Sequence, residues 1–387
     1  MDVEIGVGKS GRRAYGLDDI AIVPSRRTRD PEDVDVSWQL DAYEFRLPLL
    51  ASAMDGVVSP SVAVELARLG GLGVLNLEGL WTRYTDPERL LGEIAELAPE
   101  VATARMQEIY KEPVKEELIG RRVAELKAAG IVAAASLTPQ RVERSHRTAL
   151  EAGLDILVIQ GTVVSAEHLS SRTEPLNLKR FIARYDIPVI VGGCASYASA
   201  LHLARTGAAG ILVGVGPGNA CTTRGVLGIG VPQATAIADA AGARARHMEE
   251  TGRYVHVIAD GGMRTGGDVA KAIACGADAV MLGSPLARAA GAPGRGWHWG
   301  MATFHPELPR GARVRVEQLG TLQEILVGPA AENDGARNLF GALRTSMATC
   351  GYATIKDFQR AEVMVAPSLQ SEGKHYQRQQ GVGMGRR

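Results

Sequence analysis

The chain has 387 residues, of which 45% are hydrophobic, 5% are aromatic and 46 are glycine, so it can bury a large core without disulfides. Lysine and arginine together number 43, as do aspartate and glutamate, which excludes the overall basic charge of a nucleic-acid-binding protein. The first residues lack a signal-peptide pattern and no apolar run is long enough to span a membrane, so we expect a soluble, cytoplasmic protein that binds neither nucleic acid nor membrane.

Residues 1–45 are polar and mixed, which predicts a cap over a larger unit. After them, short β-rich runs alternate with amphipathic helical patterns such as 61–69, 139–152, 198–206, 232–249 and 267–275. This alternation predicts an α/β fold, a (β/α)8 TIM barrel, although an open doubly wound sheet would show the same pattern. The eight predicted strands are 47–52, 73–75, 131–136, 156–160, 188–191, 209–213, 255–259 and 277–282.

Three segments exceed what a barrel needs, and we predict that they extend a single catalytic domain over 1–387. Segment 76–130 contains helical patterns at 87–97 and 115–129, which predicts extra helices after the second strand. Segment 285–320 is rich in Gly, Pro and Arg and contains aromatic residues, which predicts a functional, flap-like loop. The tail 372–387 is expected to be loose unless it docks on a neighbour.

In a barrel, active residues lie at the carboxyl ends of the strands. The first predicted strand runs into Ser52-Ala53-Met54, the seventh into Asp260-Gly261-Gly262 and the eighth into Gly283-Ser284-Pro285. Glycine turns after the last two strands are the usual phosphate site of a barrel. Asp260 could accept hydrogen bonds from the two hydroxyls of a ribose, or it could be a turn residue before glycine.

The loop after the sixth strand, Gly214-Val215-Gly216-Pro217-Gly218-Asn219-Ala220-Cys221-Thr222-Thr223-Arg224, presents a lone thiol after a glycine run. We interpret Cys221 as a nucleophile; the alternative is a small packed thiol. Thr223 could hold or deprotonate a water or cap a turn, and Asn219 could be a phosphate-nest or turn residue. The other cysteines, at 194, 275 and 350, show no metal-ligand spacing and are expected to be free thiols.

These residues resemble the IMP dehydrogenase/GMP reductase family. The resemblance is carried by 50–57 with 70–74, by the Cys221 loop, by 260–262 through 281–284 and by Gly300-Met301, and it continues at 340–347. It implies that Cys221 attacks C2 of the purine of IMP or a related nucleotide, that hydride passes to or from nicotinamide, and that NAD and a potassium ion (K+) are the cofactors. It also implies a homotetramer.

The resemblance assigns roles to particular positions. It implies nucleotide contacts from Ser52, Met54, Asn219, Asp260, Gly262, Gly283, Ser284, Gly300 and Met301. It implies dinucleotide contacts from Gly214, Gly216 and Gln160. It implies a potassium site made by the carbonyls of Gly216, Gly218 and Cys221 and completed by a neighbouring subunit's tail, for which Glu372 is the candidate.

The chain also departs from the family pattern. No regulatory CBS module fits between Asn76 and Gly130, which is typical of the short, CBS-lacking "IMP dehydrogenase-related" branch. Gly193 stands where the family has Asn, Leu212 where it has a basic residue, and Gln160 where it has an acid. The Arg-Tyr pair of the family's mobile flap is not visible in 303–317, where Arg310 and Arg313 are possible substitutes.

The leading hypothesis is an NAD-dependent IMP dehydrogenase that makes XMP for guanine nucleotide biosynthesis, with Cys221 as nucleophile, Thr223 near the attacking water and Arg310 as the base. The first alternative is GMP reductase, which uses NADPH and releases ammonia with a Thr-Glu pair. A second is a purine-nucleotide-binding regulator without turnover. An FMN-dependent barrel would use the same phosphate loops.

Overall fold

The computed structural model describes residues 2–171, 174–301, 313–367 and 372–383, and its centre is a closed barrel of eight parallel strands. The strands follow one another around the barrel in chain order, and the last closes on the first through the pairs Val280↔Leu49 and Leu282↔Ala51. They are β6 (Leu49–Ala51), β7 (Leu72–Asn76), β8 (Ala134–Leu137), β9 (Ile156–Gln160), β10 (Val189–Cys194), β11 (Gly210–Val213), β12 (His256–Asp260) and β13 (Ala279–Leu282). Closure confirms the barrel and excludes the open sheet.

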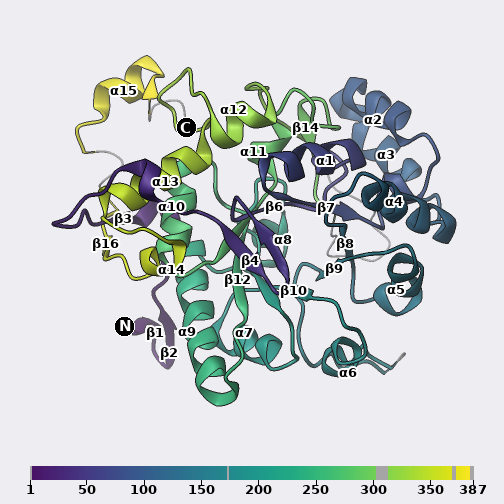
Figure 1. Cartoon of the computed structure of the whole chain (residues 1–387), viewed down its shortest axis with the longest axis horizontal. Helices are drawn as coiled ribbons and strands as arrows, with labels where there is room; N and C mark the ends of the chain where they lie inside the picture. The colour runs from purple at the N-terminus through teal and green to yellow at the C-terminus, as the bar shows by residue number, and fades with distance from the viewer. Residues whose placement is uncertain (1, 172–173, 302–312, 368–371, 384–387) are drawn as a thin grey trace.

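Helices cover the outside of the barrel, as Figure 1 shows. At least one helix follows each strand, and those that cover the barrel include α1 (Pro60–Leu69), α4 (Glu116–Ala128), α5 (Val142–Glu151), α6 (Leu178–Ile182), α7 (Tyr197–Ala204), α9 (Gln233–Thr251), α10 (Gly266–Ala274) and α13 (Leu339–Thr349). Local sequence sets their ends. Ser59 caps α1 by accepting a hydrogen bond from the Val62 N–H at 3.1 Å, and Gly70 ends it with φ +101°.

Two layers of apolar side chains hold the barrel together. The larger lies between strands and helices, and the smaller fills the barrel interior. A hairpin of β4 (Trp38–Leu40) and β5 (Tyr43–Phe45) adds Trp38, Leu40 and Phe45 to the interior cluster, so part of the predicted cap closes one end of the barrel. Leu212 belongs to this cluster and is fully buried.

The described parts of the extensions contain helices and strands that the sequence did not indicate. The segment after β7 contains η3 (Leu80–Thr82), α2 (Pro87–Glu96) and α3 (Pro99–Ile109) before α4, and in Figure 1 these helices group on one side of the barrel. The prediction missed α3. The segment after β13 contains α11 (Ser284–Ala287) and the paired strands β14 (Trp297–His298) and β15 (Val314–Arg315), followed by α12 (Leu322–Val327). The tail contains α15 (His375–Gln380).

Short elements complete the chain. The hairpin β1 (Asp2–Gly6) and β2 (Lys9–Arg12) precedes η1 (Leu17–Asp19), and β3 (Ile20–Ile22) pairs with β16 (Val363–Val365). The others are η2 (Pro31–Asp33), α8 (Thr223–Leu227) and α14 (Ile355–Phe358). Within the described ranges, no helix has the length and apolar character to cross a membrane.

Candidate functional site

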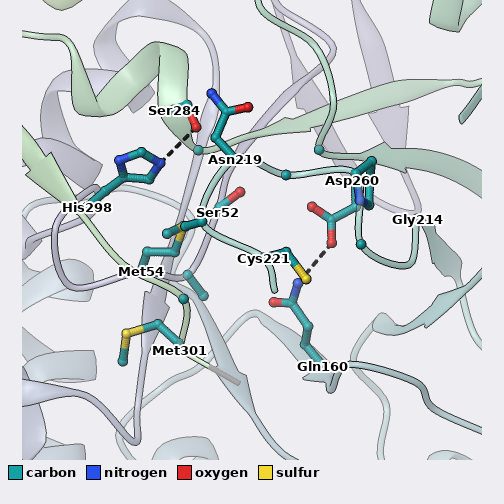
Figure 2. Close-up of a pocket in the computed structure, with 18 of the residues that line it drawn as sticks. Ser52, Met54, Gln160, Gly214, Asn219, Cys221, Asp260, Ser284, His298 and Met301 are labelled. Carbon is teal, nitrogen blue, oxygen red and sulfur yellow. Dashed lines mark hydrogen bonds between the residues drawn. The ribbon is translucent and has the colours of Figure 1, made fainter. Parts of the chain in front are cut away.

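A cavity opens at the carboxyl ends of the strands, lined by residues at or just after the ends of β6, β7, β8, β9, β11, β12 and β13. Fifteen of the candidate residues line it. They are Ser52, Met54, Gln160, Gly214, Gly216, Gly218, Asn219, Cys221, Thr223, Asp260, Gly262, Gly283, Ser284, Gly300 and Met301. Figure 2 draws residues that line this space and labels ten of them.

The loop between β11 and α8 presents Cys221 to this cavity. Cys221 is exposed, and its Sγ lies 3.2 Å from Oγ1 of Thr223, which is buried. The loop must begin with glycine, because Gly214 has φ +155° and a Cβ there would lie 2.2 Å from the Asp260 carbonyl oxygen. A nucleophile with a hydroxyl beside it is therefore held on a loop whose path is fixed by close backbone packing.

Arg224 ties the start of this loop to the segment that follows α8. Its Nε donates to the Val215 carbonyl at 3.3 Å, and its Nη2 donates to the Val231 carbonyl at 2.7 Å. Its side chain also fills the space beside Gly216, where a Cβ would lie 2.6 Å from Arg224 Cγ. The guanidinium that follows the thiol in sequence thus supports the loop from behind.

The other cysteines differ from Cys221 in exposure. Burial raises the pKa of Cys194 to about 12 and that of Cys275 to about 11, and Cys350 is also buried. A thiol that cannot ionise near neutral pH is a poor nucleophile. All three are free cysteines, as expected, and their less exposed positions make them poorer candidates for a nucleophile than Cys221.

Asp260 lies at the end of β12 and faces Gln160 across the barrel mouth. Gln160 Nε2 donates to Asp260 Oδ2 at 3.1 Å. Burial raises the pKa of Asp260 to about 7, and the hydrogen bond from Gln160 opposes that rise. The two glycines that follow have φ +77° and +81°, and they turn the chain back over Pro217 of the Cys221 loop.

The turn after β13 and the start of α11 form another wall. Gly283 packs so closely that a Cβ would lie 3.2 Å from Met54 Sδ and 3.4 Å from Ser52 Oγ. Ser284 Oγ is 2.8 Å from Nε2 of His298, a buried residue of β14 whose pKa burial lowers. Figure 2 shows this hydrogen bond. Sequence reasoning noted aromatic residues in segment 285–320 but assigned no role to His298.

A relay of buried hydrogen bonds, Asp55–Tyr110–Trp299, lies beside the segment Gly300-Met301. Tyr110, directly after α3, donates from its hydroxyl to Asp55 Oδ2 at 2.5 Å and accepts from Trp299 Nε1 at 2.8 Å. The same hydroxyl lies 3.9 Å from Met301 Sδ. Sequence reasoning missed Tyr110, because no local signal links it to residues 189 positions away.

The wall after β7 and β8 adds polar groups that sequence reasoning also missed. Asn76, Glu78, Ser136 and Thr138 line the cavity. Glu78 is buried, accepts from the Thr138 N–H at 2.6 Å and lies 3.5 Å from Arg141 Nε. Their position at the carboxyl ends of strands was the available signal.

Three predicted residues have a different outcome. Arg310 lies outside the described residues. Arg313 hydrogen-bonds the carbonyls of Ile94 and Leu97 at the end of α2 and lies over the Trp297 ring, 4.0 Å from its centre, and it is not among the residues that line the cavity. Glu372 is exposed and does not line the cavity of its own chain.

The sequence model of the IMP dehydrogenase / GMP reductase domain matches residues 14–303. The chain belongs to the IMP dehydrogenase / GMP reductase family. A Mycolicibacterium smegmatis protein named an uncharacterized oxidoreductase is 50% identical in an alignment that covers 94% of this chain and 99% of the relative. Inosine-5'-monophosphate dehydrogenase of Borreliella burgdorferi is 31% identical and is matched over 91% of this chain and 93% of its own length.

A solved structure agrees with this assignment. The crystal structure of an IMP dehydrogenase/GMP reductase-like protein from Corynebacterium glutamicum superposes with a TM-score of 0.89 at 46% identity, covering 94% of this chain and 97% of that one. The comparisons confirm the predicted resemblance, and they make the chain an oxidoreductase of this family. The family match includes the Cys221 loop and Met301 but ends at residue 303.

Proposed function

We propose that this family member is an IMP dehydrogenase, which oxidises IMP to XMP with NAD through a covalent bond to Cys221. The observation that carries the proposal is the exposed thiol of Cys221, 3.2 Å from the Thr223 hydroxyl, in one cavity with Asp260 and the Gly283-Ser284 turn. A nucleophile, a hydroxyl beside it, a carboxyl group and a phosphate-type turn are the groups that covalent chemistry on a nucleoside monophosphate requires.

In the first half-reaction, Cys221 Sγ loses its proton and forms a bond to C2 of the purine. A bound nicotinamide dinucleotide would supply the acceptor for the hydride that leaves C2 with its electron pair. In the second half-reaction, water adds to C2, the C–S bond breaks, and XMP and the free thiol are released. The balance is IMP, NAD and water giving XMP, NADH and a proton.

The chain's own residues orient the nucleotide for this attack. Asp260 accepts from the ribose hydroxyls, as in other nucleotide sites. Gly283, Ser284 and Asn219 offer N–H, hydroxyl and amide groups to the phosphate. Ser52, Met54, Gly262, Gly300 and Met301 enclose the remainder of the nucleotide. Holding the reacting atoms together in this way removes much of the entropic barrier.

The cavity also has polar groups for a second ligand. Gln160, Gly214 and Gly216 are the proposed dinucleotide contacts, and Asn76, Glu78 and Thr138 extend the polar wall on the side of β7 and β8. Amide, hydroxyl and carboxyl groups of this kind suit the carboxamide and ribose of a nicotinamide dinucleotide. The donor set therefore fits NAD.

The Cys221 loop also fits the potassium ion that the family resemblance implies. Alkali cations bind oxygen ligands, and the carbonyls of Gly216, Gly218 and Cys221 belong to one short loop. The Cys221 N–H already donates to the Gly218 carbonyl at 3.0 Å, and a carbonyl retains a second lone pair. The ion would stiffen the loop, and the exposed Glu372 of a neighbouring subunit in a homotetramer would complete its shell.

In the second half-reaction Thr223 orients the attacking water, and Arg310 is the proposed base. GMP reductase is the second candidate, because Arg313 is tied to α2 and is unavailable as a substitute base. Two absorbance assays with potassium separate the candidates. NADH appearing with IMP and NAD supports the proposal, whereas NADPH consumption with GMP supports the reductase. If neither assay shows an absorbance change but calorimetry shows that IMP binds, the protein would be a regulator.

A further inference from the structure

Gln160 and Asp260 meet across the mouth of the barrel. Gln160 ends β9 and Asp260 ends β12, so β10 and β11 separate them within the sheet. Their side chains nevertheless meet with Nε2 3.1 Å from Oδ2, as the dashed line in Figure 2 shows. Both residues line the cavity that holds Cys221.

The direction of this hydrogen bond follows from its chemistry. An ionised carboxylate only accepts, so the amide must present its N–H group to Asp260 and turn its oxygen away. Among the described residues, Gln160 is the side-chain donor that Asp260 has, and no cation contributes to its environment. A half-buried carboxylate whose pKa desolvation raises to about 7, with one neutral donor, is close to the balance between its ionised and protonated forms.

We propose that Gln160 is a positioning residue that keeps Asp260 ionised and holds one carboxylate oxygen, so that the other faces the nucleotide. The inference rests on the proposed function in one respect: Asp260 is taken as the acceptor for the ribose hydroxyls. A protonated carboxyl group would offer one acceptor fewer to two donor hydroxyls. Affinity for a ribonucleotide therefore depends on the charge that Gln160 maintains.

The same geometry explains why an amide suits position 160. A carboxyl group there would lie about 3 Å from Asp260, and two carboxyl groups at that distance share one proton and titrate as a pair. The pair would lose its second proton only at high pH, where repulsion would disturb Asp260. Gln160 supplies the hydrogen bond without that second charge.

The test uses Gln160→Met, which keeps the length of the side chain and removes the N–H, and calorimetric binding of IMP across about pH 6 to 9. If the loss of the donor raises the pKa of Asp260 from about 7 by one unit, the ionised fraction at pH 6.5 falls about 8-fold. We expect IMP affinity to fall by about that factor at pH 6.5 and to approach that of the wild type near pH 9. If Gln160→Met loses the same factor of IMP affinity at every pH, or loses no affinity, the inference is overturned.

Two further variants make the result specific. In Gln160→Glu the two carboxyl groups retain a donor as long as they share one proton. Its loss of IMP affinity should therefore grow toward high pH, whereas the loss in Gln160→Met should grow toward low pH. Asp260→Asn removes the titrating group, so its weaker binding should not vary over this range. If Gln160→Met does not fold, Gln160→Glu decides by itself. Its loss of IMP affinity should grow toward high pH, and a loss that does not depend on pH overturns the inference.

A second readout separates this inference from the proposed function. The titration of Asp260 can be followed by carboxyl NMR in the free enzyme, where Gln160→Met should raise its pKa by about one unit. If the wild type binds no IMP, the proposed function fails, and this shift still decides the role of Gln160. If the wild type binds IMP and the shift is absent, the inference alone fails.

Discussion

Replacing Tyr110 with Phe tests whether the extra helices after β7 control the site. The change removes one hydroxyl that donates to Asp55 at 2.5 Å, accepts from Trp299 at 2.8 Å and lies 3.9 Å from Met301 Sδ. A hydrogen bond to a charged group contributes about 1.5–3 kcal/mol, and depriving a buried N–H of its acceptor costs about 1–3 kcal/mol. Because the two effects share one hydroxyl and are not additive, we expect a loss of about 3 kcal/mol.

The matched control is Tyr84→Phe. Its hydroxyl donates at 2.8 Å to the Ile109 carbonyl at the end of the same helix, but Tyr84 does not line the cavity. One neutral hydrogen bond contributes about 1 kcal/mol, so urea unfolding should separate the two variants by about 2 kcal/mol.

Kinetics give the second readout of this comparison. A displaced Met301 would loosen the enclosure of the nucleotide, so the KM for IMP should rise about 10-fold in Tyr110→Phe and stay near the wild-type value in Tyr84→Phe. Equal stability losses and equal KM values for the two variants would refute the relay.

Three other changes have distinct outcomes. Cys221→Ala should abolish turnover and leave calorimetric IMP binding intact; substantial remaining NADH production would remove the covalent step. Gly283→Ala should fold, because its new methyl group meets the flexible Met54 Sδ at 3.2 Å, but should raise the KM for IMP about 10-fold or more; an unchanged KM would exclude this turn from the site. Asp278 is fully buried, and its Oδ2 lies 2.9 Å from Arg244 Nη1. Asp278→Asn should therefore lower the free energy of unfolding by about 3–5 kcal/mol. Although burial alone would raise the pKa of Asp278, Arg244 and Lys356 lower it overall, so its contribution is present above the unfolded pKa near 3.9 and is lost as pH falls below it, which urea titrations from about pH 7 to 3 can check.

Local patterns were sufficient for much of the fold. Apolar runs bounded by glycine and proline predicted every barrel strand, because each strand is buried on both faces and carries that composition locally. The boundaries moved by at most three residues: β9 lies where it was expected, and β8 begins at Ala134 where residue 131 was expected. The helix α3 was missed because its pattern is weakly amphipathic, with Ala102, Met106 and Ile109 as its buried residues.

The site divides along a similar line. Glycine runs and strand ends identified the Cys221 loop, Asp260 and the Gly283 turn, since these features are local in sequence. The contacts that these residues make are not local. Gln160 and Asp260 are 100 positions apart in the sequence, and Ser284 contacts His298 only because β14 folds back over the mouth of the barrel. Such pairs exist only once the barrel has closed, so no pattern along the chain could reveal them.

Closure also gives physical meaning to two departures from the family pattern. A Cβ at Gly193 would lie 2.7 Å from the Gly214 carbonyl oxygen, so a side chain there would push against the first residue of the Cys221 loop. Leu212 is fully buried in the barrel interior, where a basic side chain would need a partner for its charge. Position 212 carries an apolar side chain and position 193 carries no side chain. Polar contacts to the proposed nucleotide would therefore come from the rim of the barrel, from Asp260 and the turns after β11 and β13. The balance between Gln160 and Asp260 is therefore the part of this rim on which small changes should act most strongly.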